Sequence, residues 1–105
     1  MQMNLKMEFV SDPGHGWLIV SRKQLDLVGL QPSDFSSYSY QNSEVNPTHF
    51  ALEVVPSLTA MRIDEDCDAG LFLSRCYDLD LRDDMHITET FLNSDAPVRS
   101  WPSIN

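Results

Sequence analysis

The chain has 105 residues, 42% of them hydrophobic, and a formal net charge of −9 from 16 acidic and 7 basic residues. This length and composition suit one folded domain with a single core and exclude a disordered chain. No apolar run reaches the roughly 18 residues of a membrane span, and residues 1–8 lack a secretory signal, so we expect a cytoplasmic protein without a membrane partner. Because acidic surfaces repel phosphate backbones, we expect no direct binding to nucleic acid.

The first quarter of the chain predicts a β-hairpin followed by a short helix. Residues 3–10 alternate between apolar and polar side chains, and residues 17–20 are continuously apolar, which is typical of strands. Between them, Asp12-Pro13-Gly14-His15-Gly16 has the composition of a tight turn. Ser21 then stands at an N-cap position before a two-turn helix over residues 22–28. The side chains of this helix and its end that we expect in the core are Leu25, Val28 and Leu30.

Four later segments have the composition of strands: residues 38–41, 49–55, 60–63 and 85–92. We expect residues 60–63 to return as the hairpin partner of residues 49–55. The segment after them has apolar residues at the spacing of one helix face, and Asp66 or Asp68 is expected to cap that helix. The residues of this helix face are Ala69, Phe72, Leu73 and Cys76.

These elements predict an α+β fold, with an antiparallel sheet of four to six strands and two helices packed on it. A single domain is expected over residues 1–105, with residues 93–105 as an irregular tail. Two cysteines, Cys67 and Cys76, fall nine residues apart on the second helix, which separates them by about 13.5 Å along the axis. A disulfide needs Cα atoms within about 7 Å, so we expect free thiols, as in a reducing compartment.

The acidic residues are concentrated in one part of the chain. Residues 64–84 contain eight carboxylates and two arginines, so this segment alone carries −6 of the −9 charges. We expect its carboxylates to bind a partner protein that has a basic surface. The commoner alternative is that the charge only keeps the protein soluble. The expected partner-binding residues are Asp64, Glu65, Asp66, Asp68, Asp78, Asp80, Asp83 and Asp84.

One short motif is similar to a zinc site. Asp12-Pro13-Gly14-His15-Gly16 looks like the opening motif of zinc-dependent cell-wall amidases, in which the histidine after Asp-Pro-Gly is a metal ligand. A catalytic zinc needs about three protein ligands, and only His15 has a recognisable context here. His49 or His86 would have to complete the site without a recognisable context. We therefore favour a hairpin turn at this position.

Two further motifs also lack decisive residues. Asp64-x-Asp66-x-Asp68 begins like a calcium loop, but the sixth position is Ala69 instead of glycine and the twelfth is Arg75 instead of glutamate. Cys67 stands near a helix N-terminus, where the pKa of a thiol is lowered, but its neighbouring carboxylates oppose a thiolate. We expect no catalytic residue, no metal ligand and no cofactor.

Three motifs together resemble a known group of proteins. Asp12-Pro13-Gly14-His15-Gly16-Trp17-Leu18, Tyr38-Ser39-Tyr40-Gln41 and Glu65-Asp66-Cys67-Asp68-Ala69-Gly70-Leu71-Phe72-Leu73 are similar to a family of small uncharacterised proteins of phages, plasmids and bacterial mobile elements. The resemblance covers roughly residues 8–77. This chain departs from the family by a longer segment at residues 42–60 and by its extension after Tyr77. The family implies an origin and a fold but assigns no activity.

The leading hypothesis is a non-enzymatic binding protein of phage or mobile-element origin that acts in the host cytoplasm. It would inhibit a host nucleic-acid-binding complex, such as a CRISPR complex, by presenting carboxylates to its basic site, as anti-CRISPR proteins and other DNA mimics do. One alternative is a metal-dependent hydrolase that uses His15 with nearby acids. Another is a structural interaction protein whose charge serves only solubility.

Overall fold

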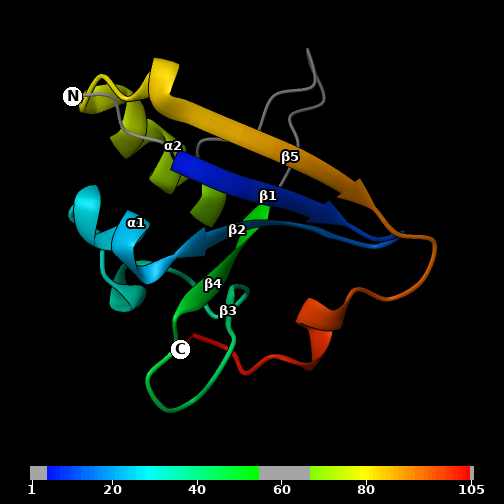
Figure 1. The fold of residues 1–105 in the computed structure, drawn as a ribbon. Coiled ribbons are helices and arrows are strands. Elements are labelled where there is room, and N and C mark those ends of the chain that lie inside the picture. The colour runs from blue at the N-terminus through cyan, green and yellow to red at the C-terminus, as the bar shows by residue number, and fades with distance from the viewer. Residues whose placement is uncertain (1–4, 55–66, 105) are drawn as a thin grey trace.

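The computed structural model describes residues 5–54 and 67–104, which form one mixed β-sheet, two α-helices and short 3₁₀ turns (Figure 1). The α+β fold with two helices is confirmed, and the sheet has five strands in the order β3-β4-β2-β1-β5. The strands are β1 (Leu5–Ser11), β2 (Gly16–Ser21), β3 (Tyr40–Gln41), β4 (His49–Val54) and β5 (Met85–Phe91). The helices are α1 (Arg22–Leu27) and α2 (Asp68–Asp78), and the 3₁₀ turns are η1 (Pro32–Asp34), η2 (Arg82–Asp84) and η3 (Pro97–Ser100).

The predicted hairpin is confirmed. β1 pairs antiparallel with β2, in a register that places Glu8 opposite Ile19 and Ser11 opposite Gly16. Leu5 and Met7 are buried on one face of β1, as the alternation predicts. β2 is buried on both sides, because the sheet carries a hydrophobic cluster on each of its faces.

The last strand differs from the expected antiparallel arrangement. β5 lies at the sheet edge and pairs with β1 in parallel, from Leu5 opposite Met85 to Ser11 opposite Phe91. β4 runs antiparallel to β2, and β2 antiparallel to β1, so β4 and β5 point the same way. The connection from β4 to β5 passes through α2, and a helical crossover of this kind returns the chain in parallel.

The predicted start of α1 is confirmed by a capping box. The Ser21 hydroxyl accepts a hydrogen bond from the Gln24 amide at 3.2 Å, and the Gln24 side chain accepts one from the Ser21 amide at 2.8 Å. Val28 ends the helix, and Gly29 follows with a φ of 75°, a left-handed conformation that glycine adopts without strain. The three expected core residues of this segment, Leu25, Val28 and Leu30, are all buried.

The predicted cap of α2 was wrong. The cap is Cys67, whose Sγ accepts a hydrogen bond from the Gly70 amide at 3.4 Å, and Asp66 lies outside the described residues. Asp68 is the first helical residue, and its carboxylate bonds to another segment. The predicted apolar face is confirmed, because Ala69, Phe72, Leu73 and Cys76 are buried. No disulfide joins Cys67 to Cys76, as the helical spacing required, and burial raises the pKa of the Cys76 thiol to about 11.

The sheet separates two hydrophobic clusters. The larger cluster packs α1 and α2 against one sheet face, around Leu18, Phe50 and Phe72. The smaller one lies on the opposite face, where Val98 and other C-terminal residues cover the buried Trp17. Figure 1 shows both helices on one side of the sheet and η3, in red, away from them.

Some segments of the structure differ from the predicted strands and tail. The segment expected as a strand at 38–41 forms only the two-residue β3, and residues 60–63 lie outside the described residues. The tail is less irregular than expected, since it contains η3 and a β-bridge between Ser103 and Tyr40. This bridge and the burial of Val98 hold the C-terminal segment on the sheet.

Candidate functional site

The eight carboxylates expected to bind a partner fall into three groups. Asp64, Glu65 and Asp66 lie outside the described residues. Asp68 is buried, with 8% of its surface exposed. The remaining four lie between the end of α2 and the start of β5, and we call them the acidic corner: Asp78, Asp80, Asp83 and Asp84.

The carboxylates of the acidic corner form no ion pair with any cation among residues 5–54 and 67–104. Asp78, Asp80 and Asp83 are exposed, and Asp84 is half-buried. In the part of the chain that the structure describes, both ion pairs involve Arg99, so none neutralises this corner. The nearest arginine in sequence, Arg82, instead places its guanidinium 5.1 Å from the ring centre of Tyr77. The corner therefore presents uncompensated negative charge.

The position of the corner is also electrostatically unfavourable. Asp78 is the last residue of α2, where the helix dipole has its negative end. Asp80 follows with a φ of 58°, which aspartate tolerates better than most residues. A carboxylate at a helix C-terminus costs a few tenths of a kcal/mol, and nearby carboxylates add repulsion. Folding alone does not favour acids here.

Asp68 is buried and hydrogen-bonded within the fold, so it is not part of the acidic surface. Its carboxylate accepts hydrogen bonds from the amide of Ser36, at 3.0 and 3.1 Å to its two oxygens, and from the Ser36 hydroxyl at 2.7 Å. It also accepts a bond from the hydroxyl of the fully buried Ser39. Sequence alone did not separate this acid from its neighbours. Asp68 thus fixes the start of α2 to the segment before β3.

The three motifs of the family resemblance meet in space. His15 stacks on Trp17 with ring centres 5.9 Å apart, and Trp17 meets Tyr40 edge to face at 6.3 Å. Ser39, next to Tyr40, donates its hydroxyl hydrogen to Asp68 and accepts from the Glu53 amide at 2.9 Å. Residues from the turn, from β3 and from α2 therefore form one continuous set of contacts.

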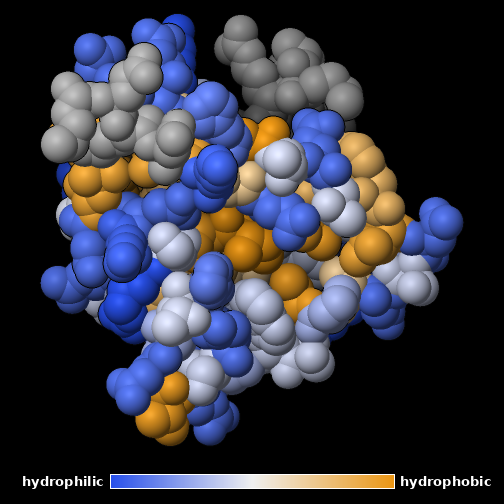
Figure 2. Space-filling model, in the orientation of Figure 1, coloured by the Kyte–Doolittle hydropathy of each residue, from blue (hydrophilic) through white to orange (hydrophobic). Residues whose placement is uncertain are grey.

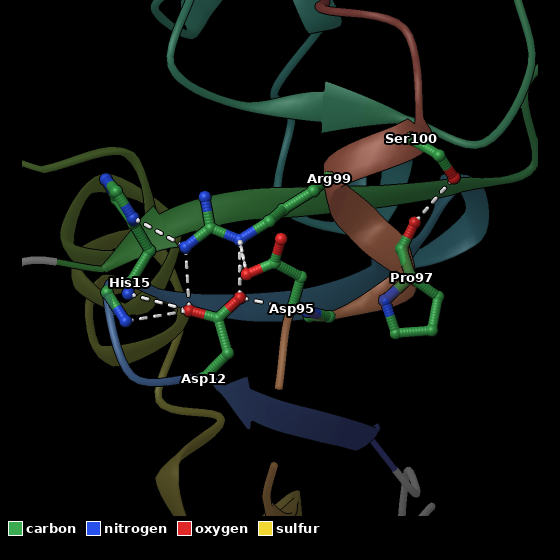
Figure 3. Close-up of polar contacts among 8 residues, drawn as sticks. Asp12, His15, Asp95, Pro97, Arg99 and Ser100 are labelled. Carbon is green, nitrogen blue, oxygen red and sulfur yellow. Dashed lines mark hydrogen bonds and ion pairs between the residues drawn. The ribbon is translucent and has the colours of Figure 1, made fainter. Parts of the chain in front are cut away.

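Asp12 and Arg99 close this region from the C-terminal side (Figure 3). The guanidinium forms two bonds to the carboxylate, Nε to Oδ2 at 2.6 Å and Nη2 to Oδ1 at 2.8 Å. The amides of Gly14, His15 and Ala96 also donate to Asp12. The Arg99 hydrogen bonds outweigh burial and hold the pKa of Asp12 well below its ordinary value of 3.8.

The contacts of His15 bear on the hydrolase alternative. Its Nδ1 lies 3.0 Å from Nη2 of Arg99, and a guanidinium can only donate, so Nδ1 is the acceptor and Nε2 carries the proton of the neutral ring. The carboxylate of Asp12 already forms an ion pair with Arg99. Within residues 5–54 and 67–104, no group of three or more His, Cys, Asp or Glu side chains is placed to hold a metal ion. Nothing described here supplies a ligand set around His15.

Glu53 borders a small pocket beside His15. The pocket has a volume of about 410 Å³ and is lined by residues of the turn together with Phe9 and Val54. Burial raises the pKa of Glu53 above its ordinary value of 4.5, the charge of Asp68 raises it further, and His15 opposes the rise. Glu53 could not be identified from the sequence, since one acid in a β-strand gives no local signal.

The sheet face opposite the helices, which we call the open face, is only partly covered by the C-terminal segment. A groove of about 740 Å³ crosses its uncovered part, between Lys6, Ile19, His49 and His86. A second hollow of about 460 Å³ shares Ile19 and His49 with it and ends at Trp101. Figure 2 shows apolar side chains inside a hollow that polar side chains border. This groove contains no residue of the acidic corner.

No protein-family model matches the chain, and no curated protein or solved structure is similar to it. Among the described residues, the helices are all too short or too polar to cross a membrane. Function is therefore inferred from the chain's own side chains.

Proposed function

We propose that this chain is a non-enzymatic binding protein whose acidic surface occupies a basic, nucleic-acid-binding surface of another protein. The resemblance to phage and mobile-element proteins suggests that the target belongs to the host cell, with CRISPR complexes as one class of candidates. Asp78, Asp80 and Asp83 of the acidic corner are the described residues expected to make the contacts. Asp68 is not among them, because its carboxylate is buried.

One observation carries this proposal: the acidic corner forms no ion pair with a described residue, and it begins at the helix C-terminus, where the carboxylate of Asp78 is destabilising. Asp78, at the negative end of α2, and the exposed Asp80 and Asp83 each lack an ion pair among the described residues. Charges with a local cost and no internal partner are expected where an external cation compensates them. Lysine and arginine side chains of a basic surface supply that compensation.

The mechanism is competition for a phosphate-binding surface. Exposed carboxylates pair with Lys and Arg side chains that otherwise bind nucleic acid, and the net charge of −9 accelerates the encounter. Because these pairs form near solvent, salt screens them over a Debye length of about 8 Å at physiological ionic strength. Binding is therefore expected to weaken steeply as salt rises, and excess DNA is expected to displace the protein.

The test compares two charge-matched triple variants as baits in host lysate at low and high salt. D78N/D80N/D83N removes charge from the acidic corner, and asparagine preserves the left-handed conformation at position 80. The control removes the same charge from exposed acids elsewhere, as D26N/E44Q/E89Q. We expect the corner variant to lose the captured partner and the control to retain it. Capture by both variants at high salt would contradict the proposal.

A further inference from the structure

β5 is an edge strand that lacks the usual protection. It contains seven residues in continuous register with β1, and within the described part of the chain no strand pairs with its outer side. Natural edge strands are blocked by charged side chains (above all lysine), proline, bulges or short length. The sequence Met85-His86-Ile87-Thr88-Glu89-Thr90-Phe91 contains no lysine, proline or bulge, and its one protecting charge is the carboxylate of Glu89. Such an edge is suited to pairing with another strand.

One hydrogen bond shows which backbone groups face outward. The Leu92 amide donates to the Ser11 carbonyl at 2.8 Å, so the backbone of Leu92 faces β1. The backbone N–H and C=O groups of successive residues in a strand point alternately to its two sides. Thr88, four residues before Leu92, therefore also directs these groups toward β1, whereas Ile87 and Glu89 direct theirs away from the sheet. Met85 and Phe91 have the same outward direction. These groups form a regular row that only another strand can satisfy fully.

The side chains of β5 are also poorly covered. Ile87 is 40% exposed and Phe91 70% exposed, although both occupy the strand face that carries the larger core cluster on neighbouring strands. The Phe91 ring meets Phe9, which packs against that cluster, edge to face with ring centres 6.5 Å apart. A further strand beside β5 would cover part of these two apolar side chains.

We propose that β5 is the interface of a symmetric dimer, in which β5 of a second copy pairs with it antiparallel. A two-fold axis at Thr88 uses the whole strand and joins the two sheets into one. It places Ile87 opposite Glu89 of the second copy, and Met85 opposite Phe91, so that outward-facing groups bond to each other. This pairing is independent of the acidic corner and of the proposed function.

Charge and side-chain chemistry select this register and this partner. An axis at Glu89 would place two carboxylates directly opposite each other, which is destabilising, and an axis at Ile87 would leave Phe91 without a partner. The axis at Thr88 avoids both, pairs threonine with threonine and brings Phe91 against a methionine. A second copy therefore meets β5 with complementary backbone groups and no facing like charges.

Cysteine crosslinking tests the register directly. Thr88 faces β1, so at the axis the two Thr88 residues form a non-hydrogen-bonded pair with Cα atoms about 4.5 Å apart, close enough for a disulfide. In the same dimer, His86 lies opposite Thr90 of the second copy, which leaves the two His86 positions about 13 Å apart. H86C is therefore a matched control on the same face, and the native cysteines are buried.

We expect T88C to form a disulfide-linked dimer under mild oxidation and H86C to remain uncrosslinked. Equal crosslinking of both variants would overturn the register. Light scattering on the unmodified protein should give twice the 12.0 kDa of one chain at micromolar concentration. A monomer at all concentrations up to about 1 mM, together with no crosslinking of T88C, would overturn the dimer.

A second pair of variants tests the backbone contribution. I87P removes an outward-facing N–H, whereas I87T keeps it and retains a β-branched side chain. We expect I87P to be a monomer with an unchanged circular dichroism spectrum and I87T to remain a dimer. An I87P dimer would contradict pairing through β5. Salt provides a last distinction: it screens repulsion between two copies of charge −9 and strengthens the dimer, whereas it weakens binding at the acidic corner.

Discussion

Asp12 and Arg99 are 87 positions apart in the chain, and their paired side chains fasten the C-terminal segment to the β1–β2 turn. The Asp12 side chain is completely inaccessible to solvent, while that of Arg99 is 34% exposed. The guanidinium also lies over Trp17, 5.5 Å from the ring centre. A single arginine thus neutralises a buried acid and covers a core aromatic residue.

Replacing Arg99 is expected to destabilise the fold in a graded manner. R99A leaves Asp12 ionised without its cation, and R99K restores the charge but not the two-bond geometry of the guanidinium. The melting temperature should therefore fall in the order unmodified protein, R99K, R99A, as followed by circular dichroism. R75A, at an exposed position on α2 that forms no ion pair with a described residue, is the control and should change stability by no more than about 0.5 kcal/mol. Equal melting temperatures for R99A and R75A would show that the pair is not stabilising.

The same pair predicts a dependence of stability on acidity. The pKa of Asp12 is lower in the folded protein than its ordinary value of 3.8, so the folded state favours the ionised carboxylate. Its contribution is complete above the unfolded pKa and is lost as pH falls below about 4 toward the folded value. Urea unfolding between pH 2 and 5 should show this loss, and D12N should lack that component of the pH dependence. An unchanged slope in D12N would assign the loss to other acids.

Ser39 is expected to be the most sensitive hydroxyl of the chain. S39A removes one hydrogen bond to the buried Asp68 and also leaves the Glu53 amide without its acceptor, at a cost of about 1–3 kcal/mol. S37A is the matched control, because Ser37 is exposed and only its carbonyl accepts a bond, from Ser103. Chemical denaturation of both variants measures the difference. If S39A lowered the free energy of unfolding by less than about 0.5 kcal/mol, as expected for S37A, the hydrogen bonds of Ser39 would not contribute to stability as proposed.

Neutralising Asp78 should stabilise the protein while weakening its proposed binding. D78N removes a negative charge from the C-terminal end of α2, a gain of about 0.3–1 kcal/mol at low salt. The gain should shrink at high salt, because the interaction is screened. Thermal melting at two salt concentrations measures it, with E44Q, at an exposed position outside the helices and strands, as the control. A destabilised D78N would mean that this carboxylate has a structural role.

Local patterns predicted much of the fold. The Ser21 cap needed only the three residues that follow it, and the buried face of α2 followed from the spacing of Phe72, Leu73 and Cys76. Cys67 could not be identified as the cap of α2, because the sequence offers better capping residues on both sides. The parallel pairing of β5 could not be predicted either, since the period-two alternation of side chains is the same in parallel and antiparallel strands.

The candidate site was harder to predict than the fold. Asp68 and Asp78 look alike in an acidic sequence, yet one is buried by Ser36 and Ser39, about thirty positions away, and the other is exposed. The partnership of Asp12 with Arg99 depends on how the tail returns across the sheet. Such long-range contacts leave no trace in local composition, and burial decides which acids remain available.

The position of β5 has a consequence for the order in which the chain folds. β1 is synthesised before the other strands and pairs on one side with β2, but the strand on its other side consists of residues 85–91. Asp12 likewise pairs with Arg99, which is synthesised much later. A nascent chain that has reached only β4 cannot yet complete its sheet. Pairings so distant in sequence fold slowly, because a long loop must close before contacts form. Closure of this sheet is therefore expected only after residues 85–91 have been synthesised and have reached β1.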